Sequence, residues 1–74
     1  MSTPLEVPVR GESIRLGQLL KLAGVVDDGA MAREVIERGL VAVNGEVDTR
    51  RGRQVRPGDV VTYESETLAV TAEL

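Results

Sequence analysis

The sequence predicts an α+β domain in which two short helices pack on a small, mostly antiparallel β-sheet. Apolar residues first recur with the period of a helix, in two stretches that each end at a glycine, and from Val41 onward they alternate with the period of a strand. With 74 residues the chain has room for one modest core. We therefore assign residues 1–74 to a single domain.

The first two elements are predicted by a change of period near Ser13. Residues 5–9 alternate as in a strand, and Pro8 restricts that strand to an edge or to its own end. Gly24 is placed to terminate the helix that follows. The apolar face of this helix has the spacing i, i+3, i+4 and i+7 and consists of Leu16, Leu19, Leu20 and Ala23.

A second helix is predicted between a polar break and Gly39. Asp27 or Asp28 is suited to cap its start, and Glu34 and Arg38 have the spacing of a favourable ion pair. Its apolar positions are Met31, Ala32, Val35 and Ile36.

A hairpin follows, because Asn44-Gly45 is a strong two-residue turn signal. Val41 and Val43 should face the core, Ala42 the other side, and Val47 should restart the apolar face.

The end of the chain predicts a loop and two more strands. Residues 48–54 contain no apolar residue, so we expect them to run along the surface. Val55 should re-enter the core before a Pro57-Gly58 turn, and the two strands are expected at 60–64 and 68–71. Tyr63 on the first of these should be packed rather than serve as a stacking platform.

Composition excludes several classes of function. The chain has no cysteine and no histidine, so it lacks the commonest transition-metal ligands, the commonest general base and the most nucleophilic side chain. It also shows no nucleophile–base pair and no phosphate-binding loop. We expect no enzyme, metal or cofactor. Without a signal peptide or a run of about 20 apolar residues, we expect a cytoplasmic protein that does not bind membranes.

The charge is unevenly distributed along the chain. The net charge is −3, yet residues 14–56 carry eight basic and six acidic side chains. Attraction to phosphate depends on the local field, so a basic patch on an acidic domain still binds nucleic acid.

The order and spacing of four segments resemble a known family. They are Ile-Arg-Leu-Gly-Gln-Leu-Leu-Lys-Leu-Ala (14–23), Gly-Leu-Val-Ala-Val-Asn-Gly-Glu (39–46), Arg-Arg-Gly-Arg (50–53) and Val-Arg-Pro-Gly-Asp-Val-Val (55–61). Together they resemble the RNA-binding domain first described in ribosomal protein S4, often called the αL motif. The similarity is greatest to its short free-standing YaaA-like and YbcJ-like members, with a core motif at 14–61.

This resemblance implies binding of structured RNA, ribosomal or transfer RNA, by the face that joins the second helix to the strand-and-loop segment. We further expect ribosome association and a monomer. The matching basic positions, and our candidate RNA-binding residues, are Lys21, Arg33, Arg50, Arg51 and Arg53. Two positions depart from the family: Ala30 or Met31 replaces a small polar residue, and Gln54 replaces a usual lysine.

The residues themselves favour the same reading. Arginine matches phosphate oxygens with a planar fork and stacks on unpaired bases, and here it outnumbers lysine eight to one. Three like charges within residues 50–53 repel one another, and Asp48 is the only acid nearby. Replacing all three should remove charge and leave the core intact.

Two alternatives stay open. Lys21 could be an ordinary surface lysine, and Arg33 could simply pair with Glu37. The chain could instead be a protein-interaction module acting on a ribosome-associated or nucleic-acid-associated partner.

Overall fold

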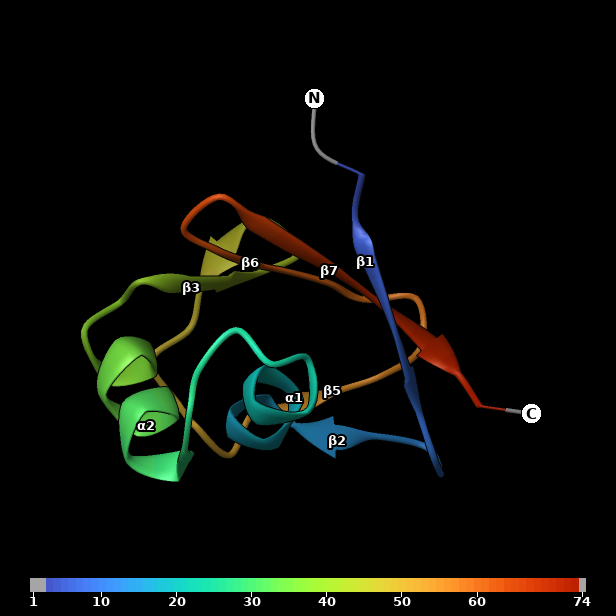
Figure 1. Cartoon of the computed structure of the whole chain (residues 1–74), viewed down its shortest axis with the longest axis horizontal. Helices are drawn as coiled ribbons and strands as arrows, with labels where there is room; N and C mark the ends of the chain where they lie inside the picture. The colour runs from blue at the N-terminus through green and yellow to red at the C-terminus, as the bar shows by residue number, and fades with distance from the viewer. Residues whose placement is uncertain (1–2, 74) are drawn as a thin grey trace.

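The computed structural model describes residues 3–73 and confirms the predicted α+β class. In chain order the elements are β1 (Leu5–Val9), β2 (Ile14–Arg15), α1 (Leu16–Leu22), α2 (Gly29–Glu37), β3 (Val41–Val43), β4 (Glu46–Val47), β5 (Gln54–Val55), β6 (Val60–Tyr63) and β7 (Glu66–Ala72). Both helices lie on the same side of the main sheet (Figure 1).

Within residues 3–73, five strands form the main sheet in the order β1-β7-β6-β3-β4. All neighbouring pairs are antiparallel except β1 and β7, which run parallel with Val7 opposite Val70. The strand at 5–9 is thus an edge strand, as Pro8 predicted. A separate two-residue ladder joins β2 to β5 and pairs Arg15 with Gln54.

The predicted helix and turn signals are confirmed. Gly24 and Gly39 follow the two helices with φ of 75° and 77°, and the side chain of Asp28 caps α2 by accepting a hydrogen bond from the Met31 amide. At the hairpin, Asn44 and Gly45 adopt φ of 52° and 86°. Such positive φ values at both central residues are what a tight hairpin requires.

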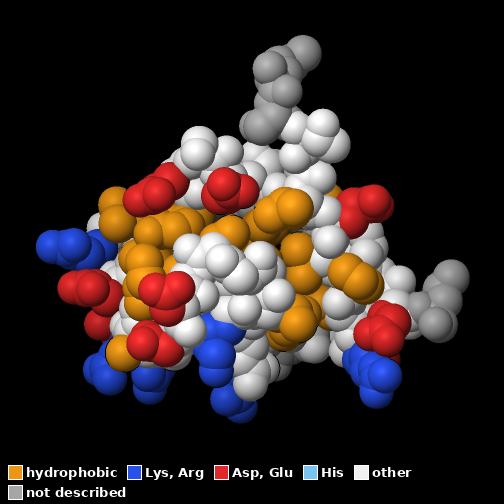
Figure 2. All heavy atoms as spheres, in the orientation of Figure 1, with side chains coloured by type: hydrophobic (Ala, Val, Ile, Leu, Met, Phe, Trp, Pro, Cys, Tyr) orange, Lys and Arg blue, Asp and Glu red, His pale blue; other side chains and the backbone are white. Residues whose placement is uncertain are grey.

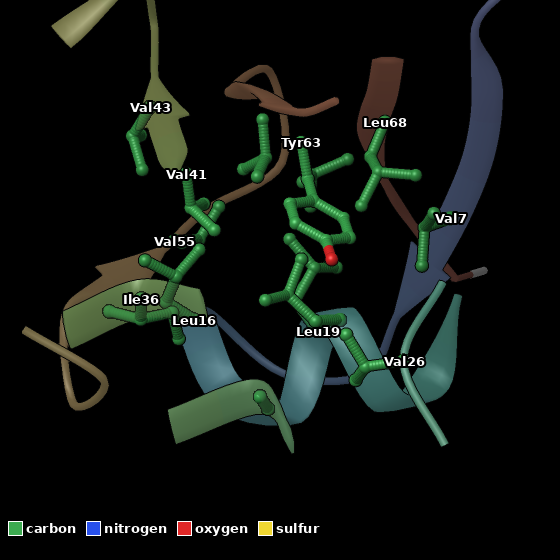
Figure 3. Packing of buried hydrophobic residues seen from close by; sticks show 14 of the residues in the cluster. Val7, Leu16, Leu19, Val26, Ile36, Val41, Val43, Val55, Tyr63 and Leu68 are labelled. Carbon is green, nitrogen blue, oxygen red and sulfur yellow. The ribbon is translucent and has the colours of Figure 1, made fainter. Parts of the chain in front are cut away.

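The core lies between the sheet and the two helices, and Figure 3 shows its side chains converging there. Leu16, Leu19 and Leu20 of α1 are fully buried, as predicted, and so are Ile36, Val41 and Val55. Tyr63 is only 5% exposed, so it is packed and unavailable for base stacking.

Three local expectations are wrong. Val47 is 63% exposed, because the two-residue hairpin pairs it with Ala42, whose face of the sheet lies opposite Val41 and Val43. Asp48 is buried, although the polar stretch 48–54 was expected on the surface. The ion pair on α2 joins Arg33 to Glu37, and no bridge between Glu34 and Arg38 forms within residues 3–73.

Within the described part of the chain, neither helix is long and apolar enough to cross a membrane.

Candidate nucleic-acid interface

The arginine loop, residues 48–53, packs directly on the first turn of α1. The amide of Leu16 donates to the carbonyl of Arg53 at 2.8 Å, and the amide of Gly17 donates to that of Arg51 at 3.1 Å. The first amides of a helix have no partner inside it, and here loop carbonyls satisfy two of them in place of a side-chain cap. The loop is therefore fixed to the helix by its backbone.

A side chain at position 17 would make ordinary van der Waals contacts with the arginine loop and with α2. A Cβ there would lie 3.6 Å from the Arg51 carbonyl oxygen and 3.9 Å from Cδ1 of Ile36. α1 also contacts α2. Three segments of the chain thus meet: the arginine loop, α1 and the first turns of α2.

A groove of about 340 Å³ lies where these segments meet. Four basic residues line it, with small or uncharged residues between them, and no carboxylate is among the described residues of its lining. We call it the basic groove. Its residues are Arg15, Gly17, Gln18, Lys21, Gly29, Ala32, Arg33, Arg51 and Gly52.

The surface view agrees with this placement. Most of the Lys and Arg side chains visible in Figure 2 lie along the edge formed by the two helices, whereas acidic side chains also gather over the sheet.

The structure brings only part of the predicted site together. Lys21, Arg33 and Arg51 all line the basic groove, whereas Arg50 and Arg53 are not among its lining residues. Sequence reasoning missed Arg15 and Gln18. A usable signal existed, because both lie within the 14–23 segment: Arg15 directly precedes the first turn of α1 and Gln18 lies within it, where the arginine loop packs.

Arg50 and Arg53 instead surround the carboxylate of Asp48. Arg50 donates to it from Nε at 3.1 Å and from Nη2 at 2.9 Å, and Arg53 donates from Nη1 at 2.7 Å. The Asp48 side chain is 6% exposed. Hydrogen bonds from Arg50 and then Arg53 hold the pKa of Asp48 well below its usual range, so it stays ionised.

Arg33 is held by a weaker ion pair than Arg50 and Arg53 are. Its Nε lies 3.1 Å from Oε2 of Glu37, and both side chains are more than half exposed. Exposed pairs of this kind contribute about 0.5 kcal/mol or less, so a phosphate can compete for the guanidinium.

Gln54, which stands where the family usually has a lysine, makes its contacts with neighbouring residues of the fold. It pairs with Arg15 in the β2–β5 ladder, and its Oε1 accepts a hydrogen bond from the hydroxyl of Ser13 at 3.1 Å.

Within residues 3–73 no group of three or more ligating side chains is placed to hold a metal ion.

Comparison with known proteins decides the family. The model of a family described as the S4 domain matches residues 7–71. The chain belongs to the S4 domain family. This confirms the resemblance predicted from the order and spacing of its motifs.

Individual S4-domain relatives support the assignment. The chain is 45% identical over 64 residues to the "Probable ribosome maturation protein RlbA" of Bacillus subtilis (strain 168), covering 86% of this chain and 87% of that protein. It is 34% identical over 62 residues to the "RQC P-site tRNA stabilizing factor" of Listeria innocua, covering 84% of this chain and 66% of the other.

A solved structure shows the same fold. The solution structure of YbcJ from Escherichia coli, described as revealing an αL motif involved in RNA-binding, superposes with a TM-score of 0.74 at 32% identity. The match covers 97% of this chain and 92% of YbcJ. The predicted αL-motif fold is therefore confirmed.

Proposed function

We propose that this S4 domain binds structured RNA, ribosomal or transfer RNA, through the basic groove and catalyses no reaction. The observation that carries the proposal is the groove itself: Arg15, Lys21, Arg33 and Arg51 converge from three segments, and no carboxylate is among its described lining residues. Such a field attracts a phosphate backbone even on a protein with a net charge of −3.

The preference for structured RNA follows from what the domain lacks. Recognition of extended single strands relies on aromatic side chains that stack on successive bases. Tyr63 is the only aromatic residue of the chain, and it is buried. A fixed loop beside two helices reads the spacing of phosphates on a folded backbone instead.

The names of the relatives support the kind of RNA proposed. One is named for ribosome maturation and another for stabilising the P-site tRNA. These names support ribosomal or transfer RNA as the partner that we propose.

Binding of a labelled stem-loop RNA with a bulge, measured by fluorescence anisotropy, tests the proposal. The stem-loop should bind more tightly than poly(U) of equal length at the same salt. Replacing Lys21 and Arg33 together by alanine should weaken stem-loop binding by about tenfold or more, because two charge-assisted phosphate contacts are lost.

The matched control replaces Arg38 and Arg56 by alanine. Both residues are exposed and neither lines the basic groove, so the charge change is the same while the groove is intact. Equal losses in the two double variants would reject the groove as the site. A partner captured from cells that survives ribonuclease treatment would favour the protein-interaction alternative.

A further inference from the structure

Asp48 is the central hydrogen-bond acceptor of the arginine loop, and each of its carboxylate oxygens accepts two hydrogen bonds. Oδ1 accepts from the backbone amide of Arg50 at 2.9 Å and from its Nε, while Oδ2 accepts from Nη2 of Arg50 and Nη1 of Arg53. The Asp48 amide donates to the Val41 carbonyl at 3.1 Å. One buried carboxylate thus joins the loop to the sheet.

Two side-chain nitrogens of Arg50 and one of Arg53 donate hydrogen bonds to Asp48. The carboxylate occupies the Nε and Nη2 edge of Arg50, which is the bidentate edge that a phosphate would otherwise take. The Arg53 side chain is 31% exposed, and the Arg53 amide also closes a turn onto the Arg50 carbonyl at 3.1 Å. Both arginines therefore hold the arginine loop in its conformation.

Arg51 lies between Arg50 and Arg53 in the sequence, and its contacts differ from theirs. Its carbonyl is held by the amide of Gly17, and the residue lines the basic groove. Among residues 3–73 no ion pair involves Arg51. Of the three loop arginines, it is the one without a carboxylate partner among the described residues.

We infer that Asp48 is a positioning residue for RNA binding. Its ion pairs with Arg50 and Arg53 hold the arginine loop in a conformation in which Arg51 presents its guanidinium to RNA in the basic groove. The inference rests on the proposed function and deepens it, because it divides three adjacent arginines into two that shape the loop and one that contacts RNA.

Simple charge and positioning predict opposite signs for the loss of Asp48. Removing a carboxylate near a phosphate-binding groove makes the local field more positive, which by itself tightens binding. If Asp48 positions Arg51, the same removal frees the loop and weakens binding. Asp48→Asn, which keeps the shape of the side chain and removes its charge, separates the two.

Glu37→Gln is the matched control. Glu37 also pairs with an arginine of the site, Arg33, but its side chain is 53% exposed and holds no loop in place. We expect Asp48→Asn to weaken stem-loop binding by about tenfold, the loss of one charge-assisted contact, and Glu37→Gln to leave it unchanged or slightly tighter.

A double-mutant cycle with Arg51→Ala shows whether Asp48 acts through Arg51. In the Arg51→Ala background, Asp48→Asn should cost little further affinity, because the contact that it positions is already absent. A general loss of structure would weaken both backgrounds equally. All affinities are measured below the melting temperature of each variant.

Arg50→Lys and Arg51→Lys form a second pair that preserves net charge and remains usable if Asp48→Asn does not fold. Lysine cannot supply the bidentate grip on Asp48 but still attracts phosphate as a point charge, so Arg50→Lys should weaken binding more than Arg51→Lys. Unchanged binding by folded Asp48→Asn, or equal losses in the lysine pair, overturns the inference and leaves the proposed function standing. Absence of RNA binding by the parent protein overturns both.

Discussion

Replacing Arg51 by alanine should make RNA binding less sensitive to salt by about one counterion. Each phosphate neutralised by a cationic side chain contributes roughly 0.7 to 0.9 to the slope of log affinity against log salt. Four cationic residues line the basic groove. The parent protein should therefore show a slope of about −3 to −3.6, and affinity should fall by roughly 100-fold between about 50 and 200 mM salt.

The variant removes one of these four charges without touching the core. Arg51 is exposed and makes no ion pair within residues 3–73, so Arg51→Ala should melt within a few degrees of the parent. Its slope should be shallower by about 0.7 to 0.9. Arg38→Ala makes the same change in net charge outside the groove and should keep the parental slope.

Fluorescence anisotropy titrations of the stem-loop RNA, repeated across a series of salt concentrations, give these slopes directly. A slope near zero for the parent would refute electrostatic binding altogether. Equal reductions in Arg51→Ala and Arg38→Ala would show that binding follows total charge, and the assignment of Arg51 would then fail.

Two further predictions concern the buried carboxylate. The triple replacement of Arg50, Arg51 and Arg53 by alanine should lower the melting temperature by roughly 10 °C, because a buried carboxylate that loses its charged partners costs about 2 kcal/mol; thermal melting followed by circular dichroism measures this, and a parental melting temperature would show that the Asp48 cluster stabilises nothing. The free energy of unfolding should also decline as pH falls below about 4, since Asp48 and Asp59 have lowered pKa values in the fold, and such groups stabilise it above their unfolded pKa and lose that contribution as pH falls through the folded one. Urea unfolding at a series of pH values should show a shallower decline for Asp48→Asn than for the parent.

The first of these reverses an expectation from sequence. Because residues 48–54 hold no apolar side chain, removal of all three arginines was expected to leave stability unchanged. The structure shows that Asp48 enters the interior and takes two of the arginines as partners. A polar composition does not report that one carboxylate is buried, because burial depends on the neighbouring strand and helix and not on the segment itself.

Predictions of helix ends and turns, which depended on local backbone chemistry, were confirmed. Glycines after each helix, Asp28 at the start of α2 and the Asn44-Gly45 turn all restrict backbone geometry within a few residues. Their conformations are therefore encoded where they occur. Asn44 also illustrates the limit of this reasoning, because its side chain accepts a hydrogen bond from Val60 and donates one to Asp59, contacts that only the folded chain reveals.

Pairings between distant segments were not predictable in the same way. The parallel alignment of β1 with β7 joins the two ends of the described chain, and the β2–β5 ladder contains only two residues per strand. The alternation within a segment, as in residues 5–9, does not reveal which strand the segment will pair with. The β2–β5 ladder nevertheless sets the site, since it brings the arginine loop to the start of α1 and places Arg15 beside the groove.

The distribution of charge explains how an acidic chain can carry the proposed site for a polyanion. The domain measures 32 × 29 × 22 Å, whereas the Debye length in physiological salt is about 8 Å. The strand β7 begins at Glu66, which follows Glu64 in the turn after β6, and this hairpin belongs to the sheet rather than to the groove. Charges separated by several Debye lengths are screened from each other, so a phosphate in the groove would respond mainly to nearby charges, which include its four cations and Glu37, the ion-pair partner of Arg33. Asp48 is the acid that lies close in sequence to Arg51, and its charge is already compensated by Arg50 and Arg53. The net charge of −3 therefore opposes binding weakly, and the positioning role that we infer for Asp48 makes Arg51 the loop arginine expected to contact RNA.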